Sequence, residues 1–268
     1  MRHIFITYGD DRYYFSRLRL SKQARKSGLF DRVKVYTPDD LPKEITGTDN
    51  FSQLRGGGSW IWKPYIINHA LSQCDYGDVV WYADSGCSIN PESEEWQQFF
   101  AALADHNSLY FAYRSDYDYH WERFGVNSVN LRHWTKPVAQ KFLNSYYGSN
   151  SYLEKPSLWW MLAVKKTVDN KIIGEWLKLT LAHPEIINDP FGAELDSLPD
   201  DFNQHRHDQP LLSCIVRKYA EETNSLIMDE TAESRLGSPA IVAERYRAGK
   251  TSFWPDLKTR IYYLFHDR

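Results

Sequence analysis

The 268-residue chain has few cysteines and no long apolar run. Its three cysteines, Cys74, Cys87 and Cys214, form no CxxC pair, which argues against a disulfide framework and against a cysteine-based zinc site. No stretch approaches the ~20 apolar residues of a transmembrane helix, and no signal-like apolar run follows Met1. We therefore expect a cytoplasmic protein that touches a membrane at most peripherally.

The chain also lacks an excess of basic charge. Its net charge of −3 is unlike that of a nucleic-acid-binding domain, so we expect no nucleic-acid partner. The basic residues between positions 17 and 26 are interpreted as a solvated helix face. Aromatic residues, in contrast, are abundant, with 10 Trp, 18 Tyr and 13 Phe. Most should lie in the core, although such rings also stack well on sugars and bases.

Strands and helices alternate along the first part of the sequence. We expect a strand at 3–8, a helix at 11–26 with Tyr14, Phe15 and Leu18 on its apolar side, and a strand at 33–36. A helix with Pro64 in its first turn and an unbroken apolar strand at 79–83 follow. This alternation predicts an α/β domain with a parallel sheet.

The second part continues the pattern less regularly. Asn90 and Pro91 are expected to start a helix whose apolar side includes Trp96, and Val168 belongs to a later helix that reaches Leu177. Strands are expected at 109–113, 159–164, 226–227 and 241–242, helices at 136–146 and from 209 onward, and loops at 37–59, 114–132 and 183–206.

Asp84 follows directly after five apolar residues, at the mouth of the strand at 79–83. In open α/β sheets ligands bind beyond the carboxyl ends of the strands. A buried carboxylate needs a partner, which a sugar hydroxyl or Mg²⁺ or Mn²⁺ can supply. Alternatively, Asp84 caps the turn formed with Ser85 and Gly86.

A glycine run, Gly56-Gly57-Gly58, stands between Arg55 and the helix that contains Lys63. Close backbone approach, a helix N-terminus and two cations suit a diphosphate. The spacing is not that of a Walker A loop, and a flexible turn explains it equally well.

The segment His205-Arg206-His207-Asp208-Gln209 precedes another helix. Asp208 is either a helix cap or a functional residue, and as a functional residue it is a catalytic base or an anchor for a sugar hydroxyl. The two histidines are only two positions apart, which is a weak metal signature.

These three segments, taken together, resemble a family of bacterial glycosyltransferase-like proteins found with capsule and O-antigen polysaccharide genes. The resemblance lies in GGGSWIWKPY (56–65), DVVWYADSGC (78–87) and RHDQ (206–209), and their order and spacing span roughly residues 1–245. It implies a single α/β domain with a GT-A-like fold, in which a Rossmann-type mixed, mostly parallel sheet is flanked by helices. The nucleotide-sugar half would lie at about 1–115, the acceptor half at about 116–250 and a tail at 251–268.

The resemblance implies hexosyl transfer from a nucleotide sugar, with a UDP-sugar favoured, to a glycan or lipid-linked acceptor near the inner membrane. GT-A enzymes place a D-x-D motif after a central strand. Here Gly86 takes the place of the second aspartate, which leaves the need for Mn²⁺ or Mg²⁺ open. Asp84 is the candidate metal ligand, and the distal His266 could assist it.

The candidate site residues follow from the motifs. Asp208 and His207 are the candidate catalytic residues; the acceptor candidates are Tyr119, His120, Trp121 and Glu122; the donor candidates are Thr7, Tyr8, Arg55, Gly57, Trp62, Lys63, Asp84, Ser85, Gly86 and Gln209. Inverting and retaining mechanisms both remain open. The alternatives are a non-catalytic carbohydrate-binding protein, another nucleotide-using α/β transferase such as a nucleotidyltransferase, and, lastly, a methyltransferase.

Overall fold

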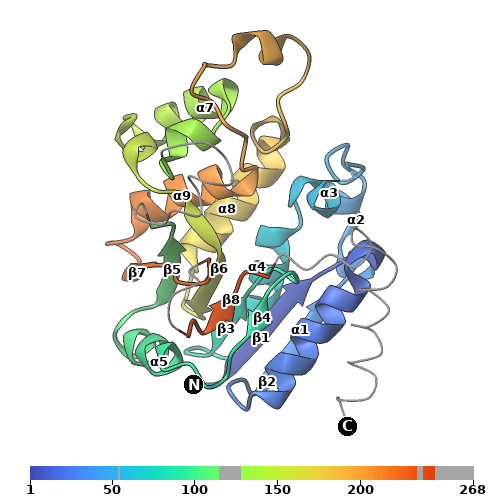
Figure 1. Cartoon of the computed structure of the whole chain (residues 1–268), viewed down its shortest axis with the longest axis vertical. Coiled ribbons are helices and arrows are strands. Elements are labelled where there is room, and N and C mark those ends of the chain that lie inside the picture. Colours follow the sequence, from blue (N-terminus) through green and yellow to red (C-terminus); the bar gives the residue numbers. More distant parts are fainter. Residues whose placement is uncertain (54, 115–127, 234–237, 245–268) are drawn as a thin grey trace.

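A six-stranded sheet forms the centre of the computed structural model, which describes residues 1–53, 55–114, 128–233 and 238–244 (Figure 1). The strand order is β2-β1-β3-β6-β5-β7. β1 (His3–Tyr8) lies parallel to β2 (Arg32–Tyr36) and β3 (Val79–Tyr82), and β5 (Ser108–Ala112) lies parallel to β7 (Ser225–Asp229). β6 (Leu158–Lys165) runs antiparallel to both β3 and β5. The predicted mixed, mostly parallel α/β sheet is confirmed.

Helices cover both faces of this sheet. One face packs against α1 (Tyr14–Lys26), α5 (Glu95–Asp105) and a small ribbon of β4 (Ser88–Ile89) and β8 (Ile241–Val242). The other packs against α4 (Lys63–Ser72), α8 (Lys171–Ala182) and α9 (Asp208–Tyr219), with α7 (Pro137–Tyr147) beyond α9 (Figure 1). Within the described ranges, none of these helices is long and apolar enough to cross a membrane.

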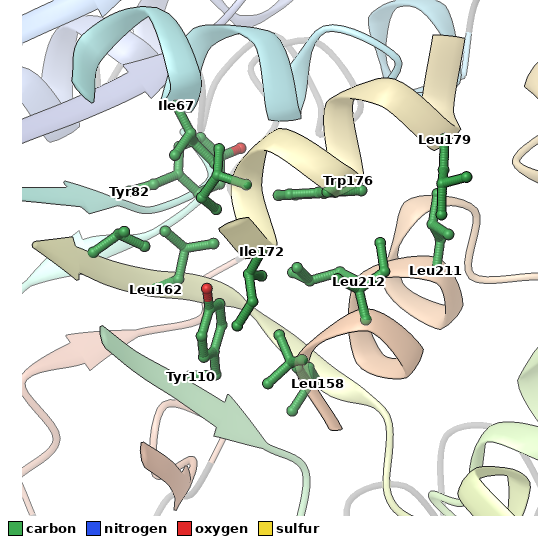
Figure 2. Packing of buried hydrophobic residues seen from close by; sticks show 14 of the residues in the cluster. Ile67, Tyr82, Tyr110, Leu158, Leu162, Ile172, Trp176, Leu179, Leu211 and Leu212 are labelled. Atoms are coloured by element: carbon green, nitrogen blue, oxygen red, sulfur yellow. The ribbon is translucent and has the colours of Figure 1, made fainter. Parts of the chain in front are cut away.

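The strands divide their side chains between two hydrophobic cores, as the period of two along a strand requires. In β3, Val80 and Tyr82 face the α4–α8–α9 side, while Trp81 faces α1 and α5. Figure 2 shows the first core: Trp176 and Leu179 of α8 lie among side chains from α4, β6 and α9. Because both faces are covered, β3 carries the unbroken apolar run read from the sequence.

Three local expectations were wrong. The expected apolar side of α1, made of Tyr14, Phe15 and Leu18, is 47%, 37% and 37% exposed, and the buried positions instead include Arg19, Leu20 and Ala24. Arg19 can be buried because it donates to the carbonyl oxygen of Cys87 at 2.9 Å and pairs with Glu244. Burial of this paired arginine, together with Ser16 and Ser21, gives α1 a polar inner face that an apolar pattern does not reveal.

The starts of two helices also differ from prediction. Asn90 does not cap α5, because its N–H donates to Ala240 across the β4–β8 ribbon and the helix begins at Glu95. Val168 is 86% exposed and precedes α8. The helix starts only after Asn170, whose backbone is left-handed with a φ of 42°.

The three expected loop regions, as far as they are described, contain only short elements. Residues 37–59 include α2 (Lys43–Thr46) and α3 (Gly56–Ser59). The segment 183–206 contains two 3-10 turns, Pro184–Ile186 and Gly192–Ser197. It crosses toward the glycine run, because the Asn50 side-chain amide donates to Pro184 O at 3.0 Å and Arg55 pairs with Asp189 at 2.9 Å.

Candidate active site

Three charged side chains meet at the carboxyl edge of β1 and β3. Asp84 stands two residues beyond the end of β3, Lys63 is the first residue of α4, and Asp208 is the first residue of α9. The ammonium of Lys63 lies 2.9 Å from Asp208 Oδ2 and 3.5 Å from Asp84 Oδ1. The hydroxyl of Tyr82 donates to the same Asp84 oxygen. The structure thus brings together all three of the motifs found in the sequence.

This group of charges is unequally exposed. The side chains of Lys63 and Asp208 are only 3% and 5% exposed, whereas that of Asp84 is 31% exposed. Asp84 is therefore the member that solvent or a ligand reaches most easily. Burial of two charges is costly unless each is paired, and the ion pair supplies that compensation.

Burial and charge act against each other on these groups. Burial alone would lower the pKa of Lys63, but the attraction of Asp208 and Asp84 outweighs it and raises that pKa, so the ammonium stays charged. Burial raises the pKa of Asp208, with Lys63 opposing and Asp84 adding to the rise. Burial and the neighbouring Asp84 raise the pKa of Tyr82, which keeps its phenol protonated as a donor.

The described residues fit a divalent metal poorly. None of them form a group of three or more His, Cys, Asp or Glu side chains that could hold a metal ion. Asp84 is the accessible carboxylate, but its Oδ1 already accepts from Tyr82 and lies 3.5 Å from the Lys63 ammonium, which would repel a dication. His266, the other predicted metal residue, lies outside the described residues.

The glycine run forms a left-handed turn. Gly56, Gly57, Gly58, Ser59 and Trp60 have φ values of 63°, 60°, 100°, 51° and 59°. Five successive left-handed residues are unusual, because each non-glycine residue costs roughly 1–2 kcal/mol in this conformation. Such strain gathers at functional sites. Here the turn places Gly57 beside Tyr8 at the end of β1, because a Cβ on Gly57 would lie 3.5 Å from Tyr8 Cε1.

An aromatic pair lies against this turn. The rings of Tyr8 and Trp62 stack with centroids 3.8 Å apart, and Trp62 Nε1 donates to Gly56 O at 2.9 Å. The hydroxyl of Tyr8 is buried and has no hydrogen-bond partner among the described residues. The hydroxyl of Thr7, unlike that of Tyr8, has a hydrogen-bond partner. Thr7 is fully buried, and its hydroxyl donates to Ala83 O at 2.8 Å, which connects β1 to the end of β3.

The start of α9 adds further polar groups to this edge of the sheet. The ring of His207 lies 4.5 Å from that of Trp60, and its Nδ1 bonds to Ile187 O at 2.9 Å. Burial lowers the pKa of His207 to about 4, so the ring is neutral at pH 7. Its Nε2 has no hydrogen bond among the described residues, and neither has the buried Oε1 of Gln209.

The neighbouring His205 is different. Its Nδ1 accepts from the backbone N–H of Lys136 at 3.3 Å, and its Nε2 donates to Ile186 O at 2.8 Å. With both ring nitrogens used by the backbone, His205 fixes the segment before α9 and has no nitrogen left for a metal.

Arg55 stands at the outer side of the glycine turn, 44% exposed and paired with Asp189. Asp189 also lies 3.5 Å from His207 Nε2. Ser85 is buried, Gly86 is partly exposed, and both form the turn after Asp84. The four acceptor candidates, Tyr119, His120, Trp121 and Glu122, lie outside the described residues.

Sequence reasoning missed two members of this site. Tyr82 is two positions before Asp84, so the period of two along a strand could have indicated that both side chains point the same way. Asp189 lies in a long irregular segment and carries no motif, so nothing in the sequence marks it.

No protein-family model matches the chain, and a search of curated proteins finds no match. The similarities found are to solved structures. A glycosyltransferase involved in the glycosylation of the major capsid of PBCV-1 is 11% identical, with a TM-score of 0.47 over 97% of this chain and 100% of that one.

Two further solved structures were found. The WbbM bifunctional glycosyltransferase is 10% identical, with a TM-score of 0.45 over 89% of this chain and 45% of that one. Core-mannan synthase A from Aspergillus fumigatus, solved in a form with Mn and GDP, is 8% identical, with a TM-score of 0.40 over 85% of this chain and 72% of that one. At these identities the functional assignment rests on the residues of the site.

Proposed function

We propose that this chain is a glycosyltransferase that moves a hexose from a nucleotide sugar to a glycan acceptor during the synthesis of a bacterial surface polysaccharide. The observation that carries this proposal is the Asp84–Lys63–Asp208 group at the carboxyl edge of β1 and β3. It joins one accessible acid and one buried acid at the edge of the sheet where α/β proteins bind their ligands.

The donor would lie across the end of β1. The Tyr8–Trp62 pair offers an aromatic wall for the base, and the unpaired Tyr8 hydroxyl offers it a hydrogen bond. Arg55 and the backbone of the glycine turn would meet the diphosphate. Asp84, 31% exposed, would accept hydrogen bonds from hydroxyls of the ribose or the donor sugar.

Asp208 would act as the base in an inverting transfer. Its carboxylate takes the proton of the acceptor hydroxyl while that oxygen attacks the anomeric carbon and the nucleoside diphosphate leaves with the bonding electrons. His207, neutral at pH 7, and Gln209 present unpaired polar atoms beside it that can orient the acceptor or donor hydroxyls. In a retaining transfer Asp208 would orient the donor instead.

A thermal-shift panel tests the proposal. UDP, GDP, UDP-glucose, UDP-galactose and GDP-mannose are each added with and without Mn²⁺. A ligand at a hundred times its Kd stabilises the native state by about 2.7 kcal/mol, which raises Tm by roughly 5–10 °C in a chain of this size. The absence of a shift with every nucleotide and nucleotide sugar would overturn the proposal.

Two variants locate the binding. Arg55→Ala and Asp84→Ala should each remove most of the shift. Arg132→Ala serves as the control, because Arg132 is similarly exposed, 48%, and also pairs with an aspartate, Asp201 at 3.1 Å. Binding without release of nucleoside diphosphate would favour the non-catalytic carbohydrate-binding alternative. Binding of UDP or GDP without any sugar preference would favour another nucleotide-using enzyme.

A further inference from the structure

The ammonium of Lys63 points at acids and away from solvent. It lies 2.9 Å from Asp208 and 3.5 Å from Asp84, on a side chain that is 3% exposed. Lys63 is also the first residue of α4, where the positive end of the helix dipole disfavours a cation. A buried lysine in this position is costly without an anionic partner, and Asp208, the nearer and more buried of the two acids, supplies one. A cation that binds phosphate would instead be expected at an exposed position.

We propose that Lys63 is a positioning residue for Asp208: its ammonium keeps that buried carboxylate ionised and holds its Oδ2, which leaves Oδ1 to take the proton of the acceptor hydroxyl. This inference rests on the proposed function, because it assumes that Asp208 is the base. Lys63 then serves the acceptor side of the reaction, and Arg55 is left as the cation for the diphosphate.

The charged surroundings of Asp208 support this role. Lys63 reaches it from α4, and Asp84 and Tyr82 face it from the end of β3. Among these side chains only Lys63 stabilises the charged carboxylate, since Asp84 repels it and the Tyr82 hydroxyl donates its hydrogen bond to Asp84. The backbone N–H of Asp208 itself adds a smaller stabilising contribution. Without Lys63, both burial and Asp84 would favour the protonated acid, which cannot accept a proton.

The first test is the pH dependence of nucleoside diphosphate release, measured with the nucleotide sugar that shifts Tm most in the panel above. A base works only when deprotonated, so activity falls as pH drops through its pKa. Lys63→Met should raise that pKa and move the acid limb of kcat/KM to higher pH by about one unit or more. Lys63→Arg keeps the charge and should leave the limb close to that of the wild type.

The second test needs no substrate. Lys63→Met leaves two carboxylates without their cation and should lower Tm by roughly 10 °C. Adding Asp208→Asn removes the buried charge, so the double variant should regain more than half of that loss. Lys136→Met is the matched control: its side chain is 1% exposed and pairs at 3.0 Å with Glu194, so Asp208→Asn should not rescue it.

The outcomes separate the inference from the proposed function. If the wild-type protein turns over no donor, the proposed function fails and the inference falls with it. If Asp208→Asn abolishes turnover but Lys63→Met leaves the acid limb in place, the inference alone is wrong. A Lys63→Met variant that Asp208→Asn does not rescue would contradict the charge coupling on which it depends.

Discussion

Replacing Gly57 with alanine tests the left-handed turn and the donor site together. Gly57 has a φ of 60°, and an added Cβ would lie 3.4 Å from Asp10 Oδ2, 3.5 Å from Tyr8 Cε1 and 3.6 Å from Trp62 Nε1. These are ordinary van der Waals distances, so alanine fits the space. What remains is the conformational cost of a left-handed alanine, about 1–2 kcal/mol. The lower freedom of alanine in the unfolded chain offsets about 0.4–1 kcal/mol of this.

The net loss for Gly57→Ala is therefore about 1 kcal/mol, or roughly 2–4 °C in Tm. Gly28→Ala is the matched control, because Gly28 has a φ of 69° and nothing within 4 Å of an added Cβ. The two variants should lose similar stability. Gly58→Ala should lose at least twice as much, because its Cβ would lie 2.8 Å from the Phe51 Cα and the backbone would have to move.

Binding then distinguishes Gly57 from Gly28. The new methyl group of Gly57→Ala lies against the Tyr8–Trp62 pair, so we expect about tenfold weaker nucleotide-sugar binding, equivalent to about 1.4 kcal/mol. Gly28→Ala should bind as the wild type does. Differential scanning fluorimetry and isothermal titration calorimetry measure the two effects. Equal affinity in both variants would refute the placement of the donor at this turn, and a much larger stability loss in Gly57→Ala would refute the described packing.

Three further predictions concern single side chains. Tyr8→Phe and Tyr152→Phe each remove a buried, unpaired hydroxyl, so Tm should stay level or rise in both, whereas nucleotide-sugar affinity should fall in Tyr8→Phe alone. Asp84→Asn should change the free energy of unfolding by about 1 kcal/mol at most, because the Asp84 side chain is 31% exposed. The same variant should reduce donor turnover by about a hundredfold, and undiminished turnover would show that Asp84 takes no part in the reaction. Between pH 6.5 and about 4, His207 binds a proton in the unfolded chain but not in the native protein, so the free energy of unfolding falls as pH drops through this window. In urea titrations His207→Gln should make this dependence of the free energy of unfolding on pH less steep, by up to about 1.4 kcal/mol per pH unit. An unchanged pH dependence would contradict the buried neutral ring.

Local patterns in the sequence placed the six strands of the central sheet to within two residues at each end, but not their order or the antiparallel direction of β6, and they missed β4. The apolar run at 79–83 placed Asp84 at the mouth of a buried strand because a covered strand shows no alternation. The inner face of α1 was missed because a buried arginine and serines are stabilised by specific partners, Glu244 and Cys87 among them, that lie far away in the chain.

The candidate site was predictable as a set of segments, but its pairing was not. The sequence assigned Lys63 to the donor and Asp208 to catalysis or a helix cap. Their mutual ion pair joins residues that no local pattern relates. The left-handed conformation of Ser59 and Trp60 could not be predicted either, because only the neighbouring glycines are residue types that favour positive φ values. The position of Asp189 beside Arg55 and His207 depends on the path of the segment 183–206, which no local sequence pattern determines.

The place of β6 between β3 and β5 has a consequence for synthesis on the ribosome. β5 leaves the ribosome well before β6, yet it joins the central sheet only through β6. Until β6 emerges, β5 therefore has no connection to the β2-β1-β3 strands, and Lys63 lacks its closest counter-charge until Asp208 follows. A product truncated near residue 115 would keep β3 with an unpaired edge, so it should depend on chaperones or aggregate rather than fold as a nucleotide-binding unit.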